Sequence, residues 1–194
     1  RQKRVPPGRD EKILVEWNGL MIAALARGGA AFGEQKYIAA AEKAAEFILA
    51  HQYRDGRLLR AYRAGRTLSS AFLTDYACLI DGLLELYEAT GKLRWLNAAR
   101  ELNAAVIEQY YDDAGGGFFF TSDDHEALIA RSKDISDGAT PSGNSVQLMN
   151  LLRLATMLGD EALREKAEQT MKCFSANVAR MAVASERFLT GVEF

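Results

Sequence analysis

The chain has 194 residues, 48% of them hydrophobic and only three of them proline, so we expect one domain with a sizeable core rather than a disordered chain. Its formal net charge is −2 and its isoelectric point is about 5.8, which excludes the basic excess typical of nucleic-acid-binding proteins. The most apolar stretch, 20–32, is interrupted by Arg27, so we also expect no membrane-spanning segment and no membrane partner.

The first twelve residues differ in composition from the rest of the chain. They are basic and contain Pro6-Pro7-Gly8, which predicts a linker over 1–12 and a single domain over 13–194. No signal-peptide pattern opens the sequence, and the two cysteines, Cys78 and Cys173, both fall within helical patterns. Two isolated cysteines of this kind are typical of buried thiols in a reducing compartment, so we expect a cytoplasmic protein.

Three glycines, Gly33, Gly91 and Gly159, interrupt the same helical pattern at intervals of 58 and 68 residues. Apolar side chains recur at matching distances before and after each glycine, which predicts a repeated helix–turn–helix unit. We expect three antiparallel pairs, each with an inner and an outer helix: 17–32 with 37–52, 73–90 with 93–110, and 145–158 with 161–181. The fold class is therefore all-α, because repeats of this length bury their apolar faces only by stacking.

Between the hairpins the composition changes at equivalent positions. Residues 55–62 and 113–121 both begin with a turn pattern that is followed by a strand-like run. These segments are interpreted as short β-excursions that lead from an outer helix to the next inner helix. The three consecutive glycines at 115–117 are interpreted as a tight turn rather than a phosphate-binding loop, because no Gly-Lys-Ser/Thr follows and no helix begins there.

The repeat places three short polar motifs at one structural position, the start of each inner helix. In parallel inner helices these starts converge on one mouth, where free N–H groups favour polar ligands. Aromatic, amide and hydroxyl groups at such a mouth suit a sugar-like ligand. The structural alternative is that the polar side chains of these motifs only cap the helices. Trp17 has the further alternative of a core aromatic. The predicted ligand-binding residues are Trp17, Asn18, Tyr76, Ser142 and Asn144.

Three carboxylates of the same region are the candidate catalytic residues: Glu16, Asp75 and Asp137. An inverting glycosidase needs two carboxyl groups about 6.5–9.5 Å apart, one protonated and one ionised. A sugar epimerase would use two imidazoles, but we expect His51 and His125 to lie away from the mouth. No His or Cys pair has metal-ligand spacing, so neither a metal nor a cofactor is expected.

Five motifs in order resemble a known family: Glu16-Trp17-Asn18-Gly19-Leu20, Asp55-Gly56-Arg57-Leu58, Leu73-Thr74-Asp75-Tyr76-Ala77, Gly115-Gly116-Gly117-Phe118-Phe119 and Asp137-Gly138-Ala139-Thr140-Pro141-Ser142-Gly143-Asn144-Ser145. They resemble the thioredoxin-domain-containing family related to spermatogenesis-associated protein. The resemblance implies a thioredoxin-like domain fused to an (α/α)6 toroid of the six-hairpin glycosidase and acylglucosamine epimerase superfamily. The present chain lacks the thioredoxin-like part and has three hairpins, about half of such a toroid. The resemblance supplies no catalytic residue.

Two classes of function remain open at this point. The first is a carbohydrate-active or carbohydrate-binding toroid domain, with inverting glycoside hydrolysis as its reaction. The second is a non-catalytic scaffold for a thioredoxin-like redox domain or another protein. Because a half-ring would leave apolar inner-helix side chains partly bare, we also expect a homodimer or a piece of a longer chain. The side chains expected to be bare are Leu79, Ile80, Leu83, Leu148, Leu151 and Leu152.

Overall fold

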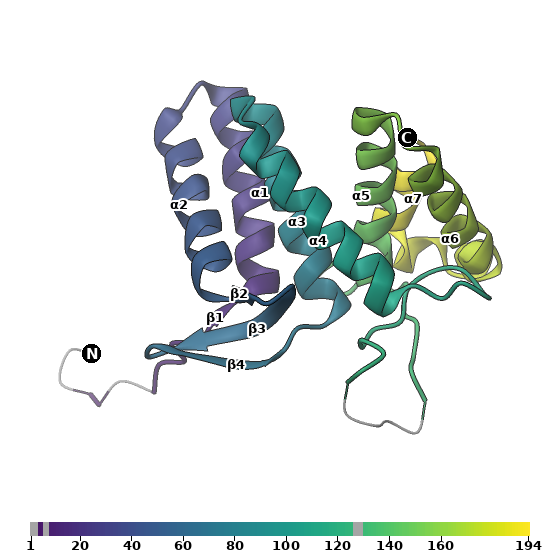
Figure 1. Cartoon of the computed structure of the whole chain (residues 1–194), viewed down its shortest axis with the longest axis horizontal. Helices are drawn as coiled ribbons and strands as arrows, with labels where there is room; N and C mark the ends of the chain where they lie inside the picture. The colour runs from purple at the N-terminus through teal and green to yellow at the C-terminus, as the bar shows by residue number, and fades with distance from the viewer. Residues whose placement is uncertain (1–3, 6–7, 126–129) are drawn as a thin grey trace.

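The computed structural model describes residues 4–5, 8–125 and 130–194. Six long helices form three hairpins, with a short four-stranded sheet near one end of the first hairpin (Figure 1). The elements in chain order are β1 (Ile13–Leu14), α1 (Val15–Phe32), α2 (Gln35–His51), β2 (Tyr53–Arg54), β3 (Arg57–Arg63), β4 (Arg66–Ser70), α3 (Leu73–Thr90), α4 (Leu93–Tyr110), α5 (Gly143–Leu158), α6 (Glu161–Arg180), a 3-10 turn (Ala182–Ala184) and α7 (Glu186–Val192). The predicted all-α hairpin fold is confirmed.

Each inner helix ends at the glycine that the repeat identified. Gly33, Gly91 and Gly159 have φ angles of 67°, 66° and 64°, in the left-handed region that a residue with a Cβ adopts only at a cost. Each glycine donates its backbone N–H to a carbonyl in the last turn of the preceding helix. The Asp160 side chain then caps α6 by accepting from the Leu163 N–H.

The inner helices form one row, with α3 between α1 and α5 and with α7 against α5. Helices α2, α4 and α6 each pack on their own inner helix. The contact between α1 and α3 is very close because it is made by two glycines. A Cβ on Gly19 would lie 2.5 Å from the Cys78 carbonyl carbon, and a Cβ on Gly82 would lie 2.9 Å from the Gly19 oxygen. The glycine of the Glu16–Gly19 motif is thus required for helix packing.

The expectation that six inner-helix side chains would be partly bare is wrong. Leu79, Ile80, Leu83, Leu148 and Leu151 are fully buried, and Leu152 is 6% exposed. These side chains belong to the continuous core, which also contains Trp95 and Val106 of the outer helix α4. The exposed large apolar side chains of the inner row include Trp17, Met21 and Phe32 of α1, together with Leu158 at the end of α5 and Val192 at the end of α7.

The sheet is built around β3, which pairs antiparallel with β1, β2 and β4. The predicted β-excursion at 55–62 is therefore confirmed. Its counterpart at 113–121 is a turn with only an isolated bridge between Tyr111 and Phe118, so that prediction was wrong in its secondary structure. The glycines are used in the turn itself, since Gly116 and Gly117 have φ angles of 71° and 72°.

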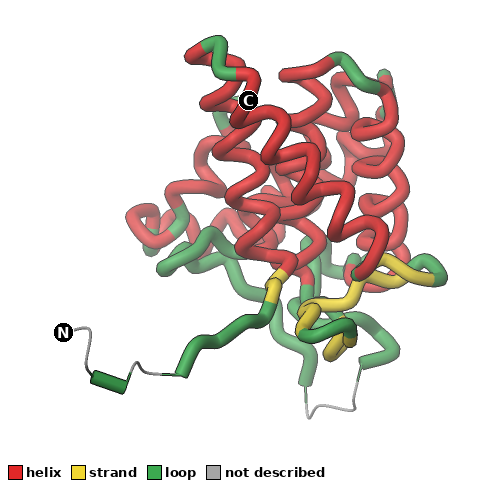
Figure 2. Tube along the Cα trace, turned by 90° about the vertical axis from the view of Figure 1, so that its left-hand side faces the viewer, coloured by secondary structure: helices red, strands yellow, loops and turns green. Residues whose placement is uncertain are grey.

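The helices form one bundle, with the strands and the long loop after α4 at its lower end (Figure 2). The described part of the predicted linker, residues 4–5 and 8–12, is exposed and extends away from the bundle. Across the described residues, no helix combines the length and the apolar composition that crossing a membrane requires.

Candidate functional site

The N-terminal ends of α1, α3 and α5 meet at the lower end of the bundle, which we call the mouth. The Glu16 N–H donates to Asp75 Oδ1 over 3.1 Å, joining α1 to α3. The Thr140 hydroxyl donates to Glu16 Oε1 over 2.9 Å, joining α1 to the loop that leads into α5. A Cβ on Gly143 would lie 2.8 Å from Leu73 Cγ, so α5 begins directly against α3.

Asp75 is completely buried and holds the start of α3. Its Oδ2 accepts from the Phe72 N–H over 2.9 Å and from the Arg60 guanidinium over 3.2 Å. Burial raises the pKa of Asp75 to about 6, against the opposing effect of the Phe72 N–H, Arg60 and the Glu16 N–H. Because both carboxylate oxygens have donors and neither contacts solvent, Asp75 is placed to position Glu16 and Arg60.

Arg60 of β3 joins the two carboxylates at the mouth. Its guanidinium lies 3.2 Å from Asp75 and 3.8 Å from Glu16 Oε2, and it also lies over the Phe72 ring at 4.9 Å. The Arg60 side chain is 28% exposed and that of Glu16 is 10% exposed. Glu16, Arg60 and Thr140 therefore form the part of this cluster that a ligand could contact.

Asp137, Ser142 and Asn144 take structural roles around the start of α5. Asp137 accepts from the Ser142 N–H over 2.9 Å and from the Arg187 N–H over 2.8 Å, so it links the loop to the start of α7. Ser142 caps α5 by accepting from the Ser145 N–H. Asn144 is buried and exchanges two hydrogen bonds with the Phe118 backbone. The capping alternative is therefore confirmed for Ser142, whereas Asn144 and Asp137 make structural contacts to other segments of the chain.

The remaining predicted ligand-binding residues differ strongly in exposure. Tyr76 is buried, and its hydroxyl accepts from the Leu58 N–H over 2.8 Å. Asn18 donates to the Leu14 carbonyl within the first turn of α1. Trp17 is 62% exposed beside Glu16, so the alternative of a core aromatic is wrong. Trp17 is the one member of the predicted set with an open aromatic face.

Aromatic side chains surround the mouth. Phe72 stacks on Phe120, with centroids 4.6 Å apart, and on His125, with centroids 5.6 Å apart. The expectation that His125 lies away from the mouth was therefore wrong, because the loop after α4 folds back onto the start of α3. His51 does lie elsewhere, against Phe47 and Tyr62.

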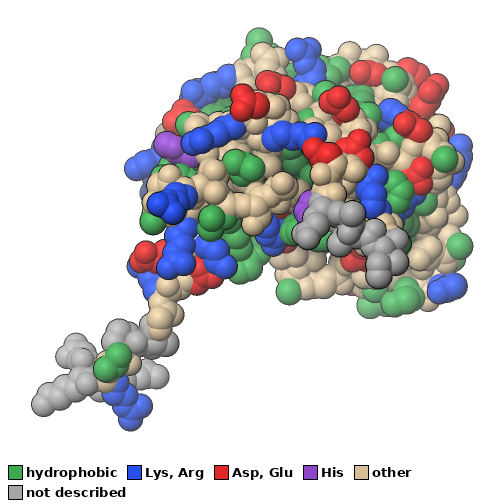
Figure 3. All heavy atoms as spheres, turned by 60° about the horizontal axis from the view of Figure 1, so that its bottom comes forward, with side chains coloured by type: hydrophobic (Ala, Val, Ile, Leu, Met, Phe, Trp, Pro, Cys, Tyr) green, Lys and Arg blue, Asp and Glu red, His purple; other side chains and the backbone are tan. Residues whose placement is uncertain are grey.

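A small cavity of about 200 Å³ lies between the first turns of α3 and α5 and the 134–142 loop. Seen from this end, Lys and Arg side chains gather near the base of the N-terminal arm, with Asp and Glu side chains among them (Figure 3). Among the described residues, no three His, Cys, Asp or Glu side chains form a group that would hold a metal ion.

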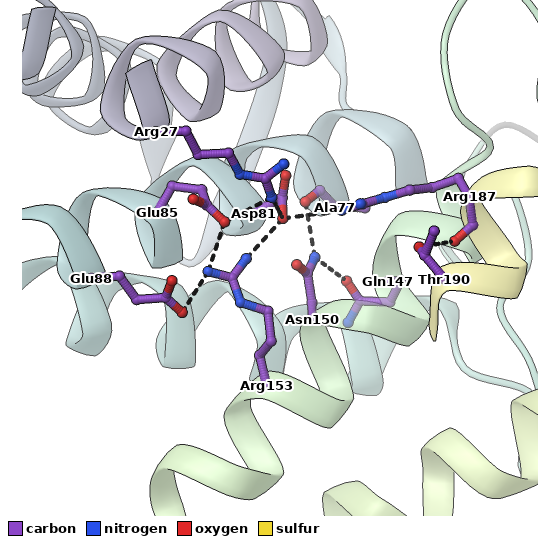
Figure 4. Close-up of polar contacts among 10 residues, drawn as sticks. All are labelled: Arg27, Ala77, Asp81, Glu85, Glu88, Gln147, Asn150, Arg153, Arg187 and Thr190. Atoms are coloured by element: carbon purple, nitrogen blue, oxygen red, sulfur yellow. Dashed lines mark hydrogen bonds and ion pairs between the residues drawn. The ribbon is translucent and has the colours of Figure 1, made fainter. Parts of the chain in front are cut away.

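A second polar cluster, which the sequence analysis missed, lies halfway along the inner helices (Figure 4). Arg153 of α5 lies 3.0 Å from Asp81, 2.8 Å from Glu85 and 2.8 Å from Glu88. Arg27 of α1 lies 2.8 Å from Glu85, and Arg187 of α7 lies 3.4 Å from Asp81. We call these six residues the inner charged network: Arg27, Asp81, Glu85, Glu88, Arg153 and Arg187.

The sequence does contain a signal for this network. Arg27, Glu85 and Arg153 each stand six residues before the glycine that ends their helix, so the repeat places all three at one level. Charged residues in the middle of apolar helices are rarely buried unless they are paired. The network joins α1, α3, α5 and α7, and Asn150 adds a hydrogen bond from α5 to the Ala77 carbonyl of α3.

Similarity to known proteins accounts for almost the whole chain. No protein-family model matches it. It is 38% identical over 195 residues to spermatogenesis-associated protein 20 of Mus musculus and 37% identical to that of Homo sapiens, matches that cover 95% of the chain and 25% of each relative. An uncharacterized protein of Caenorhabditis elegans is 34% identical over 206 residues, which covers 98% of the chain and 28% of that protein. The chain is a homologue of one part of spermatogenesis-associated protein 20. It spans about a quarter of the length of these relatives.

Solved structures with this fold act on carbohydrates. A GH76 α-mannanase of Bacteroides thetaiotaomicron superposes with a TM-score of 0.70 at 17% identity over 90% of this chain and 46% of the enzyme. A cellobiose 2-epimerase of Spirochaeta thermophila also has a TM-score of 0.70, at 16% identity, over 87% of this chain and 44% of the epimerase. An unsaturated glucuronyl hydrolase of Bacillus sp. GL1 has a TM-score of 0.67, at 16% identity, over 88% of this chain and 49% of the hydrolase. This homologue of spermatogenesis-associated protein 20 therefore has a glycosidase-like α/α toroid fold, of which it forms about half.

Proposed function

We propose that the mouth binds a carbohydrate and that this chain supplies one half of the binding site. The observation that carries the proposal is the joining of Glu16, Arg60 and Thr140 across three elements, together with the exposed ring of Trp17, which follows Glu16 in α1. The proposed ligand contacts are Trp17, Glu16, Arg60 and Thr140, with Asn18, Tyr76, Ser142 and Asn144 as the residues that shape the mouth.

The chemistry of these groups suits a sugar. Ligand sites combine apolar and aromatic surface with a few well-placed polar groups that set orientation. An exposed Trp ring offers a flat face for the C–H side of a pyranose. A carboxylate, a guanidinium and a hydroxyl that are already held by one another are pre-oriented, so little conformational entropy is lost when sugar hydroxyls bind to them. The glycosidase-like fold of the chain also favours a carbohydrate as the ligand.

Tryptophan fluorescence tests the proposal, because the chain has only two Trp residues and they differ in exposure. Trp17 is 62% exposed and Trp95 is 2% exposed. In a Trp95→Phe variant, all Trp emission comes from Trp17, and we expect mannose, mannobiose, glucose or cellobiose to shift it to shorter wavelength with saturation. The matched Trp17→Phe variant should show no shift. If no neutral sugar changes the emission of the Trp95→Phe variant, the proposal is wrong.

Catalysis at this mouth would make the chain part of an inverting glycoside hydrolase, with Glu16 and either Asp75 or Asp137 as the two carboxyl groups. Burial raises the pKa of Asp75 to about 6, which is the direction of shift that a general acid needs. Hydrolysis of nitrophenyl glycosides by the purified chain, abolished by Glu16→Gln, would support it. Sugar binding without hydrolysis would limit the function to binding.

A scaffold is the second candidate function. It is favoured by the roles of Asp75 and Asp137, whose carboxylates are engaged by backbone N–H groups, and in the case of Asp75 also by Arg60. In that case the polar motifs serve only to fix helix ends. The fluorescence titration separates the two functions, since a scaffold leaves the emission of Trp17 unchanged by every sugar.

A further inference from the structure

The inner charged network borders a cavity of about 240 Å³ that the carbohydrate-binding proposal does not use. Arg27, Arg153 and Arg187 line it together with Glu85 and Glu88, and Met149, Met157 and Phe194 supply apolar surface. Arg27 lies 11 residues after Glu16 on the same helix, roughly 16 Å along its axis. The cavity is therefore separate from the mouth and would take its own ligand.

The three arginines of the cavity are not equally engaged. The Arg153 side chain is 7% exposed and contacts three carboxylates, so its N–H donors are already engaged. Arg27 is 52% exposed and has a close contact to Glu85. Among the described residues, the Arg187 guanidinium has one carboxylate neighbour, Asp81, at 3.4 Å, and its side chain is 23% exposed. A guanidinium carries five N–H donors, so Arg187 keeps most of them for a ligand.

The charges that line the cavity favour an anion. Three guanidinium groups and two carboxylates line the cavity, whereas Asp81, which is 5% exposed and lies within 3.8 Å of all three guanidinium groups, is not part of the lining. An arginine fork binds a carboxylate through two parallel hydrogen bonds. Glu88, whose side chain is 48% exposed, leaves carboxylate oxygen free to accept from ligand hydroxyls. The volume lies below the roughly 300–1,000 Å³ of sites for drug-sized molecules, so the ligand is small.

We propose that this cavity binds a small sugar acid, with its carboxylate on Arg187 and Arg27 and its hydroxyls on Glu88. Met149 and Met157 provide the apolar surface against one face of the sugar ring. The proposal does not depend on the mouth, because no residue is shared between the two sites.

Calorimetric titration of the purified chain with glucuronate, glucose and inorganic phosphate tests this site. We expect saturable binding of glucuronate, and no binding of glucose or phosphate at the same concentrations. Arg187→Gln should weaken glucuronate binding about tenfold or more, because a charge-assisted hydrogen-bond pair is lost. Arg180→Gln is the matched control on the exposed end of α6, and it should bind as the unaltered chain does. Equal binding of phosphate would show a general anion site and overturn the proposal, as would glucuronate binding that Arg187→Gln leaves unchanged.

A second measurement on the unaltered chain covers the case in which Arg187→Gln disturbs folding. The side-chain Nε–H resonances of arginine are resolved in a nitrogen–proton NMR spectrum. Glucuronate should shift those of Arg187 and Arg27 and leave that of Arg60 unchanged. A shift confined to Arg60 would assign the anion to the mouth and overturn the cavity proposal while leaving the mouth proposal intact.

Discussion

The mouth and the inner charged network are both polar clusters on the same inner helices, but their surroundings differ. At the mouth, Arg60 of β3 has a side chain that is 28% exposed and Thr140 is half-buried in the loop before α5, and both contact the nearly buried Glu16 at the start of α1. In the network, Asp81, Glu85 and Arg153 are each 5–7% exposed and depend on one another. The partly exposed groups of the mouth, Arg60 and Thr140, are therefore available to a ligand, whereas the buried pairs of the network hold helices together.

The largest effect is expected from Arg153→Met, which leaves Asp81 and Glu85 buried with fewer partners. Removing one partner of a buried ion pair costs about 3–5 kcal/mol. Chemical denaturation should show this loss in the free energy of unfolding. Arg164→Met is the matched control, because the Arg164 side chain on α6 is 43% exposed and, among the described residues, its ion-pair partner is Glu161 alone, at 3.6 Å. A similar stability for both variants would show that the network does not hold the helices together.

A second large loss of stability is expected from Gly19→Ala, which tests the close contact of α1 and α3 that brings the mouth together. The added Cβ would lie 2.5 Å from backbone atoms of Cys78, which cannot move aside as a side-chain end can. We expect a loss of about 3 kcal/mol. Gly28→Ala on the same helix has nothing within 4 Å and should be neutral or stabilising. Equal melting temperatures for the two variants would contradict the close packing.

A pH effect on stability is expected from Asp75. Its pKa is raised by burial from 3.8 to about 6, so the folded state holds this proton more tightly than the unfolded state. The resulting stabilisation is complete below about pH 4 and is lost as the pH rises through about 6, by at most about 3 kcal/mol. Unfolding free energies measured across this range should fall for the unaltered chain and change less for Asp75→Asn. Parallel curves for the two proteins would show that Asp75 does not titrate there.

The smallest effect concerns self-association, which we expect because α1 exposes Trp17 and Met21 at the open edge of the half-ring. Sedimentation equilibrium should show a dimer, and Met21→Lys should weaken it about tenfold, the equivalent of about 1.4 kcal/mol. Leu93→Lys changes an equally exposed side chain at the start of the outer helix α4 and should have no effect. A monomer at high concentration would contradict the expectation.

Much of the fold was predictable because each repeat has a glycine with apolar residues at the same distances before and after it. Gly33, Gly91 and Gly159 determined where the inner helices end, and the same count brought Glu16, Asp75 and the start of α5 to one end. The residue spacing does not show which atoms a side chain will contact. Tyr76 and Asn144 therefore looked like ligand groups, although tertiary contacts to Leu58 and Phe118 occupy them.

The missed features have physical reasons as well. The inner charged network was not predicted, because a charge within an apolar helix does not by itself show which charges of the neighbouring helices it will pair with. The place of His125 depends on how the loop after α4 folds back, and loop paths leave little trace in periodicity. The six apolar side chains that were expected to be partly exposed point into the core instead. The number of apolar residues in a helix does not show in which direction each side chain points.

The most direct test of the account is to map a neutral sugar onto the chain by backbone and side-chain NMR. If the mouth binds a carbohydrate, mannobiose or cellobiose should shift the resonances of Trp17, Glu16, Arg60 and Thr140. The resonances of Asp81 and Arg153 should not change. Shifts confined to the inner charged network, or to the apolar groove between α6 and α7 that includes Val178 and Leu189, would contradict the account.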